Sequence, residues 1–470
     1  MGKSPSSPPD PGAPTRIDVE PVLRELGERF RSVGHELYLV GGAVRDRFLG
    51  RSRPDEEVDL ATDALPDQTI EIIRSWSDTR HLGGVRFGTV GARKDGRLYE
   101  ITTFRQEVYP EEERKPAVTF GTDVVVDLSR RDFTVNATAV RLPEGDFLDP
   151  FGGLKALAAK VLDTPLHPET AFTDDPLRML RAARFASTLD FVPAPRVVRA
   201  MRAMRERLAI VSAERIQQEL TRLLLGAHPA KALEILCDTG LAEQFIPELP
   251  ALRLEQDPVH KHKDVLRHTF AVVEQCRPDL VLRLAALLHD VGKPKTRRIT
   301  PDGVQFHHHE AVGARMAEER LRALRYPNDV VEEVHKLVEM HLRFHTYGMG
   351  WTDRAVRSYV RDAGPLLDKL NQLTRADCTT ANKFKAKQLA AAQDELEQRI
   401  ARLAMEENLD AMRPPLDGNQ VMEHLGIPPG PLVGKALAYL MEIRLERGPV
   451  PDEEARALLD EWARDQGLTR

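Results

Sequence analysis

The feature that most constrains the fold is a change of hydrophobic pattern near Leu162. Up to about Gly153, short apolar runs are separated by glycine, proline and charged turns, which is typical of a mixed α/β region. After an amphipathic helix over 17–31, strands are expected in ELYLV, EVDLAT, FGTVGAR, LYEITTF, TDVVVDL, NATAVRL and DFLDP. Beyond Leu162, apolar residues recur at helical spacing almost to the C-terminus. The chain is therefore predicted to be α/β followed by all-α.

Turn-forming segments and a concentration of histidines divide the chain further. The helical part is interrupted at FVPAP, GAHPAKA, IPELPAL and MRPPLDGN. Ten of the 15 histidines lie between His260 and His345, which marks a separate chemical region. We expect a disordered tail at 1–16, an α/β head at 17–160, a helical neck and body at 161–255, a histidine-rich domain at 256–400 and a helical tail domain at 401–470.

Composition limits the classes of protein that fit. The formal charge of −6 excludes a uniformly basic surface, so nucleic acid would have to bind a local basic patch. Three widely spaced cysteines in no CxxC pattern indicate reduced thiols in a cytoplasmic protein. The N-terminus lacks the apolar core of a secretory signal, and no apolar run approaches the roughly 18 residues that a membrane span needs. We expect no membrane partner.

Two acids are placed for metal binding. Glu57 and Asp59 are separated by one residue in an expected strand, so they project from the same face. Glu100, in YEITTF, is a third acid in a neighbouring strand segment. Carboxylates sharing one face can bind Mg²⁺, which neutralises phosphate oxygens and activates a hydroxyl. The sequence therefore predicts a phosphate-chemistry site with catalytic metal.

The preceding stretch LVGGAVRD supplies groups for an anion. Gly41 and Gly42 allow a close approach of the backbone to a triphosphate, at an expected helix N-terminus. Arg45 can donate to phosphate, while Asp46 orients it or caps the turn. Each piece alone is common, but the order of glycines, charge pair and acids is specific. GxxxxGK[ST] and GxGxxG do not occur, so P-loop and dinucleotide-binding folds lack their motif.

The segment RRDFTVNA offers Arg131, Asp132 and Asn136, whose guanidinium, carboxylate and amide suit phosphate and ribose hydroxyls. An alternative for Asp132 is an ion pair that fixes a strand to a helix.

In TDDPLRMLRAARF, Asp175 and Arg178 lie three residues apart at the start of an expected helix. An aspartate accepts from an exocyclic amine while an arginine donates to a ring nitrogen, a pattern that cytosine and adenine share and that uracil and guanine lack. Arg181 and Arg184 follow on the same side of the expected helix. Three roles stay open for them, namely contact with the base, contact with phosphate and bracing of the helix.

The order of LVGGAVRD, EVDLATDA, GTV, YEITTFR, RRDFTVNA, DPFGG, DDPLRMLRAARF and SAERI resembles class II tRNA nucleotidyltransferases, the CCA-adding enzymes and their bacterial poly(A) polymerase relatives. The resemblance implies a polymerase-β-like head followed by helical neck, body and tail domains. It assigns catalytic metal to Glu57 and Asp59, with Glu100 as third acid, and ribose recognition to RRDFTVNA. The chain departs from the family at Glu57, where the pattern is Asp-x-Asp, and at Asp174, where it is Glu.

Two further features bear on the RNA substrate. Eight arginines and two acids lie between Arg178 and Arg207, a basic stripe that indicates contact with tRNA phosphates. The polar segment between Arg105 and Asp127 resembles a loop that helps the pocket change from C to A addition, with Glu107 and Arg114 as its acid and base. Ser212, Glu214 and Arg215 in SAERI are expected to cap and brace a helix.

A second set of nitrogen and oxygen ligands is dispersed through the histidine-rich region and consists of His268, His289, Asp290, His309, His341 and Asp377. Imidazole and carboxylate groups together suit a divalent metal ion. The set resembles the HD phosphohydrolase superfamily, which implies core ligands at His268, His289, Asp290 and Asp377 and a second metal position at His309 and His341. A vestigial domain without metal is the alternative.

The leading hypothesis is addition of CCA to the 3′ end of tRNA from CTP and ATP. The alternatives are poly(A) addition by a relative of the same family, and an HD-type phosphohydrolase whose head only binds RNA. The identity of the HD metal, the substrate of the HD domain and the oligomeric state are not predicted.

Overall fold

The structure is a computed structural model that describes residues 16–51, 57–108, 117–254, 264–300, 303–378, 383–407 and 413–468. The expected disordered tail at 1–16 falls almost entirely outside these ranges, as does Arg114, and the side chain of Glu107 is not described. The chain divides into two compact units, Met1–Gln244 and Phe245–Arg470. The finer division into five parts stays a prediction.

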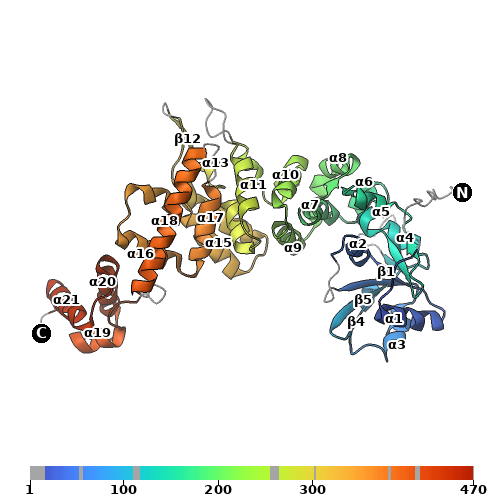
Figure 1. Cartoon of the computed structure of the whole chain (residues 1–470), viewed down its shortest axis with the longest axis horizontal. Coiled ribbons are helices and arrows are strands. Elements are labelled where there is room, and N and C mark those ends of the chain that lie inside the picture. The colour runs from blue at the N-terminus through green and yellow to red at the C-terminus, as the bar shows by residue number, and fades with distance from the viewer. Residues whose placement is uncertain are drawn as a thin grey trace. The chain divides into compact units, whose positions relative to one another are not determined.

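The first unit contains a sheet in which β1, β4 and β5 are labelled in Figure 1. The sheet has seven strands in the order β3-β4-β5-β2-β1-β8-β9. Its strands are β1 (Leu37–Val40), β2 (Val58–Thr62), β3 (Thr79–His81), β4 (Thr89–Lys94), β5 (Arg97–Thr103), β8 (Ala139–Leu142) and β9 (Phe147–Leu148). Strands β2 and β5 are parallel, and their register pairs Asp59 with Glu100. The other neighbouring strands are antiparallel.

Helices cover both faces of this sheet. α1 (Pro21–Ser32) and α3 (Pro66–Ile73) share a hydrophobic core with Val58 and Leu60 on one face. α4 (Val124–Ser129) packs with Ala61 and Phe104 on the other. Because side chains alternate along β2, Asp59 projects from the α4 face, away from the larger core.

One expected strand is wrong, because TDVVVDL forms helix α4. The side chain of Asp123 caps this helix by accepting a hydrogen bond of 2.7 Å from the backbone N–H of Val125. Val125 and Val126 are both partly exposed, whereas Val124, Asp127 and Leu128 are buried, which is a helical pattern. A run of valines favours a strand, and here the cap and the tertiary contacts outweigh that preference.

Smaller elements complete the head: α2 (Gly42–Phe48), η1 (Val85–Phe87), the β6 (Arg105–Val108) and β7 (Ala117–Phe120) ribbon, η2 (Thr134–Asn136) and α5 (Gly153–Ala158). The helical neck follows as α6 (Pro168–Asp174), α7 (Leu177–Leu189), α8 (Pro195–Met204), η3 (Arg205–Ile210), α9 (Ala213–Leu224), α10 (Pro229–Thr239) and η4 (Ala242–Gln244), with β10 (Val161–Leu162) pairing β11 (Val192–Pro193). α7 packs between α9 and α10, and its start directly after Pro176 agrees with the prediction.

Among its described residues, the second unit is helical apart from one two-stranded hairpin. Its elements are η5 (Pro250–Leu252), α11 (Val265–Gln275), α12 (Leu280–Leu288), α13 (Lys293–Thr296), β12 (Arg297–Thr300), β13 (Gly303–Phe306), α14 (His309–Ala323), α15 (Asn328–Met340), η6 (Arg343–Met349), α16 (Asp353–Ala363), η7 (Gly364–Leu366), α17 (Leu367–Asp377), α18 (Lys383–Glu407), α19 (Gly418–Leu425), α20 (Pro431–Arg447) and α21 (Asp452–Asp465).

Helix α12 is central in the second unit. Every residue from Val281 to Leu288 is buried, and α11, α14, α15 and α17 pack around the helix. Its apolar run ends in His289 and Asp290, two polar groups that are less than 2 % exposed.

Helices α19 to α21 have a hydrophobic core of their own. The prediction of an α/β region followed by helices is confirmed. Within the described residues, no helix is long and apolar enough to cross a membrane.

Candidate active site and metal centre

Three acids converge on the α4 face of the sheet. Glu57, Asp59 and Glu100 each offer a carboxylate oxygen, and these oxygens lie within 4.8 Å of one another. Burial raises the pKa of Asp59, Arg131 opposes that shift and Glu57 adds to it. Burial and the charge of Glu57 also raise the pKa of Glu100. Crowded carboxylates that hold protons more tightly than usual are a fitting set of ligands for a divalent cation.

The backbone in front of these acids is shaped by Gly41. Its φ of +71° is in the left-handed region. A Cβ at this position would lie 2.8 Å from Nη1 of Arg131 and 3.6 Å from Oδ2 of Asp59. Helix α2 begins at the next residue, Gly42, as predicted. Any side chain at Gly41 would displace Arg131 from the space beside the acids.

The predicted phosphate and ribose groups form one hydrogen-bonded chain. Arg45 donates to both oxygens of Asp46, at 2.9 and 2.7 Å, and to Oδ1 of Asn136 at 2.7 Å. Asn136 donates to Asp132 at 2.9 Å, and Arg181 donates to the second oxygen of Asp132 at 2.8 Å. Burial acts to raise the pKa of Asp132, but Arg181 and Asn136 outweigh it and lower that pKa. Asp46 orients Arg45, and Asp132 links the head to α7.

The two residues expected to read the base lie at the junction of α6 and α7. Asp175 accepts a hydrogen bond from the backbone of Leu177 at 3.1 Å, and its other oxygen forms an ion pair with Arg215 at 3.0 Å. Arg178 donates to the backbone oxygens of Ala171 and Arg130, at 3.3 and 2.5 Å. Both side chains are therefore held in place within the protein.

Arg215 forms an ion pair whose partner the sequence did not reveal. Ser212 caps α9 as predicted, accepting from the backbone N–H of Arg215. The guanidinium of Arg215, however, reaches Asp175, which is 40 residues away in the chain. A local motif cannot predict so distant a partner.

For Arg184, the structure favours bracing of the helix over contact with the base or with phosphate. Its side chain forms a 2.6 Å ion pair with the buried Glu219 of α9.

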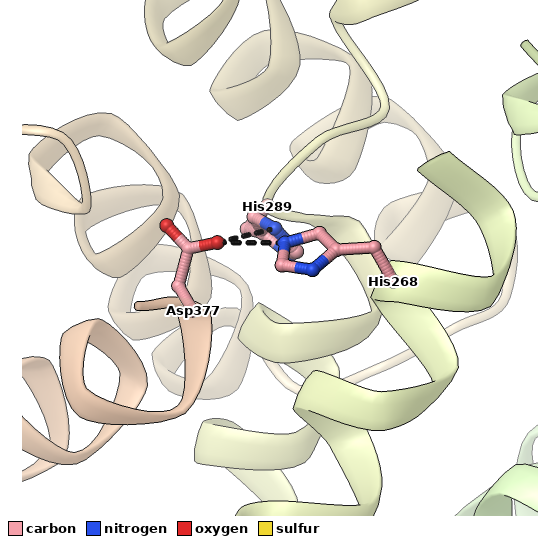
Figure 2. A group of neighbouring side chains, drawn as sticks. All are labelled: His268, His289 and Asp377. Carbon is pink, nitrogen blue, oxygen red and sulfur yellow. Dashed lines mark hydrogen bonds and ion pairs between the residues drawn. The ribbon is translucent and has the colours of Figure 1, made fainter. Parts of the chain in front are cut away.

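A second group of ligands lies in the helical unit, where His268 of α11, His289 after α12 and Asp377 at the end of α17 meet (Figure 2). Nε2 of His268 is 2.8 Å from Oδ1 of Asp377, and Nε2 of His289 is 3.5 Å from the same oxygen. Asp290, His309 and His341 form an adjoining group whose ligand atoms also lie within 4.8 Å of one another. All six predicted HD ligands are thus brought together in two groups of three.

The hydrogen bonds of three of these histidines favour the binding of a metal ion. Nδ1 of His289, His309 and His341 lies 2.8, 2.9 and 2.6 Å from the carbonyl oxygens of Ala286, Phe306 and Val338. Each Nδ1 therefore donates, and each Nε2 is a buried atom that makes no well-formed hydrogen bond; those of His289 and His309 face carboxylate oxygens of Asp290 at 3.2 and 3.4 Å. A metal ligated through Nε2, with Nδ1 held by a carbonyl, is the usual arrangement for histidine.

The charges of the group agree with this reading. Burial opposes protonation of His289, yet Asp290 and Asp377 raise its pKa to about 10. Burial, together with the neighbouring His289, lowers the pKa of His341 to about 4. Asp290 and Asp377 therefore stabilise a positive charge beside His289. His341 stays neutral, as a histidine that ligates a metal must.

Two further residues, Lys293 and His345, adjoin the group. Nζ of Lys293 lies 2.7 Å from Asp290, and Nε2 of His345 lies 3.5 Å from the second oxygen of Asp377. His307 and His308 are exposed, and His335 pairs with Glu318 instead.

The mixed sheet with its three acids and the helical unit with its two histidine–aspartate groups define a nucleotidyltransferase joined to an HD domain. Family models agree: "Poly A polymerase head domain" matches residues 37–163, "Probable RNA and SrmB- binding site of polymerase A" matches 190–252, and "HD domain" matches 265–412.

Full-length relatives specify the family. The CCA-adding enzyme of Geobacillus thermodenitrificans is 31% identical over 450 residues, covering 96% of each chain. The A-adding tRNA nucleotidyltransferase of Deinococcus radiodurans is 34% identical over 443 residues, covering 91% of this chain and 95% of its own. The crystal structure of the Bacillus stearothermophilus CCA-adding enzyme with CTP is 26% identical, with a TM-score of 0.69 over 96% of this chain and 99% of its own. The chain belongs to the CCA-adding family of tRNA nucleotidyltransferases.

Proposed function

We propose that this protein adds CMP, CMP and AMP to the 3′ end of tRNA, using CTP and ATP and releasing pyrophosphate. The observation that carries the proposal is the convergence of Glu57, Asp59 and Glu100 within 4.8 Å, beside the glycine turn and the Arg131 guanidinium. The terminal ribose hydroxyl of the RNA attacks the α-phosphate of the nucleotide, and pyrophosphate leaves. Head, neck, HD and tail domains would follow the expected boundaries.

The three acids would hold a divalent ion, which we propose to be Mg²⁺ and which would supply charge neutralisation at the α-phosphate. The chain itself does the rest of the positioning. The turn at Gly41 and Gly42 leaves room for the triphosphate at the start of α2. Arg131 and the remaining N–H groups of Arg45 donate to phosphate. Asn136 and Asp132 contact the ribose.

Base selection is assigned to Asp175 and Arg178. The carboxylate accepts from the amine of cytosine or adenine, and the guanidinium donates to the adjacent ring nitrogen. UTP and GTP present the opposite pattern of donors and acceptors and would make neither contact, so we expect CTP and ATP to be preferred over them. The ion pair with Arg215 holds Asp175 in position for this contact.

The incorporation test uses three tRNA primers that end before the first C, after one C and after two, each with a single labelled nucleotide. Two additions from CTP and then one from ATP support the proposal. Use of ATP alone on the third primer would place the chain with its A-adding relative instead. Long tails from ATP would indicate poly(A) addition. A protein that releases no pyrophosphate from CTP or from ATP with any primer would have an inert head.

The exposed arginines of the neck are proposed to bind tRNA phosphates. Arg199, Arg202 and Arg207 are exposed, along α8 and the following η3 turn. The Arg202 and Arg207 side chains also donate to backbone oxygens of the same unit. These contacts orient the guanidinium groups without neutralising them, so they remain available to an anion.

We propose a second activity, metal-dependent hydrolysis of a phosphoester, for the HD domain. The three buried Nε2 atoms, none of which makes a well-formed hydrogen bond, favour it specifically. His268, His289, Asp290 and Asp377 would hold one divalent metal, and His309 and His341 with Asp290 a second. Elemental analysis of protein loaded with Mn²⁺ should find two metals per chain and fewer in His341→Ala. Hydrolysis of bis(p-nitrophenyl) phosphate should be lost in Asp290→Ala. Wild-type protein that binds no metal would refute the assignment.

A further inference from the structure

Phe185, in the middle of α7, is surrounded by three arginines. Its side chain is 4 % exposed. The Cζ atoms of Arg184, Arg45 and Arg181 lie 4.1, 5.2 and 5.8 Å from the centre of its ring. All three distances are within the range of a cation–π interaction, about 6 Å. One aromatic ring thus contacts three cations that belong to two different parts of the first unit.

Each of these arginines also has its own carboxylate. Arg45 pairs with Asp46 at 2.7 Å, Arg181 with Asp132 at 2.6 Å and Arg184 with Glu219 at 2.6 Å. Phe133, next to Asp132 in the ribose segment, meets the ring of Phe185 edge-on at 5.8 Å. The ring therefore lies where the triphosphate turn, the ribose segment and the base-reading helix come together.

The ring adds to the attraction that holds the three guanidinium groups in place. Their carboxylates offset the repulsion between the groups, and the ring contacts all three of them in surroundings with little water. The electron-rich face of an aromatic ring attracts cations, and more strongly where water is excluded. Arg45 and Arg181 are joined through Asn136 and Asp132, so the position of one guanidinium group affects that of the other, and the ring is a further contact that both of them share.

We infer that Phe185 is a positioning residue for nucleotide transfer: its ring fixes Arg45 and Arg181 and thereby aligns the triphosphate and ribose contacts with the base-reading helix. The inference rests on the proposed function. Because these contacts serve the part that CTP and ATP share, Phe185 acts on both nucleotides equally and leaves discrimination against UTP unchanged. Displacement of reacting groups by about 1 Å can cost a factor of about a hundred.

Fluorinated phenylalanines test this inference with only a small change in the size of the ring. Phe185 of the full chain is replaced by 4-fluoro-, 3,5-difluoro- and 3,4,5-trifluorophenylalanine, which withdraw electrons from the ring stepwise. The expected result is a stepwise fall of kcat/KM for CTP and ATP alike, reaching about tenfold, the effect of losing roughly one desolvated cation–π contact. The preference for CTP over UTP should not change. Phe185→Leu should lose at least as much.

The matched control is the same series at Phe191, which is 1 % exposed and over whose ring no described arginine or lysine lies. It should leave kcat/KM unchanged. If the wild-type protein adds nucleotides, an unchanged kcat/KM across the Phe185 series would overturn the inference. An equal fall of kcat/KM in the Phe191 series would also overturn it. A changed preference for CTP over UTP would also overturn it, because the ring would then act on the base. Absence of incorporation by the wild type would instead refute the proposed function.

Discussion

Glu57 lies one residue before β2, just outside the strand that carries Asp59. The family pattern that this sequence resembles has aspartate here, and glutamate adds one methylene. The longer side chain still brings its carboxylate within 4.8 Å of the other two acids. The geometry of the group is therefore built around the glutamate.

Replacement of Glu57 by aspartate should accordingly lower activity, although it restores the family pattern. The shorter side chain would withdraw the carboxylate from the metal position by more than about 1 Å, and octahedral Mg²⁺ tolerates little displacement. We expect kcat for CMP addition to fall roughly ten- to a hundredfold. Steady-state incorporation measures this, and a Glu57→Asp enzyme faster than wild type would show that the glutamate is a weakness.

Gly41→Ala should damage the site through Arg131. The new methyl group would lie 2.8 Å from that guanidinium and force it away from the acids. We expect KM for CTP to rise at least about tenfold, the loss of one charge-assisted hydrogen bond to phosphate. The control is Gly34→Ala, where φ is +82° and nothing lies within 4 Å. Both variants place a Cβ at a positive φ, and Gly41 has a ψ of −134°, so the Tm of each variant is measured beside its KM. Equal KM values would count against the predicted role of Arg131.

At the scale of elements, α7 and α9 are joined by the ion pair of Arg184 and Glu219. Glu219 is 4 % exposed. Glu219→Gln should destabilise the first unit by about 3 kcal/mol, because it leaves a cation without its partner in a buried place. Calorimetry should show a lowered Tm. The double variant Arg184→Met, Glu219→Leu should be less destabilised than the single one, and the reverse order would contradict this explanation.

Elements were predictable where a local pattern determines them. The sequence correctly predicts that side chains around Asp59 alternate between the two faces of a strand, because strand periodicity is local. It also correctly predicts the start of α7 after Pro176, because the backbone geometry of proline is local. TDVVVDL was misread, because a side-chain cap and burial on one helical face decided a segment whose composition favours a strand. The partners Arg215–Asp175 and Arg181–Asp132 were not predictable, since tertiary packing brings together residues that lie 40 and 49 positions apart.

For the whole molecule, a net charge of −6 coexists with the basic stripe of the neck. Binding of tRNA should therefore depend on local phosphate contacts and weaken steeply with salt. Arg199→Ala combined with Arg202→Ala should raise the Kd and reduce the slope of log Kd against log salt by roughly 2, one for each phosphate contact. Filter binding over a salt series measures the slope. An unchanged slope would place the RNA elsewhere.

The central claim is that the acids of the α4 face carry out nucleotide addition to tRNA. The most direct measurement compares wild type with Asp59→Asn on tRNA lacking CCA, supplied with CTP and ATP, and uses Asp67→Asn on the exposed start of α3 as control. Wild type and Asp67→Asn should add two C and one A. Asp59→Asn should lose incorporation by a factor of about 10³ or more, with an unchanged fold by circular dichroism. Near-normal incorporation by Asp59→Asn would contradict the claim.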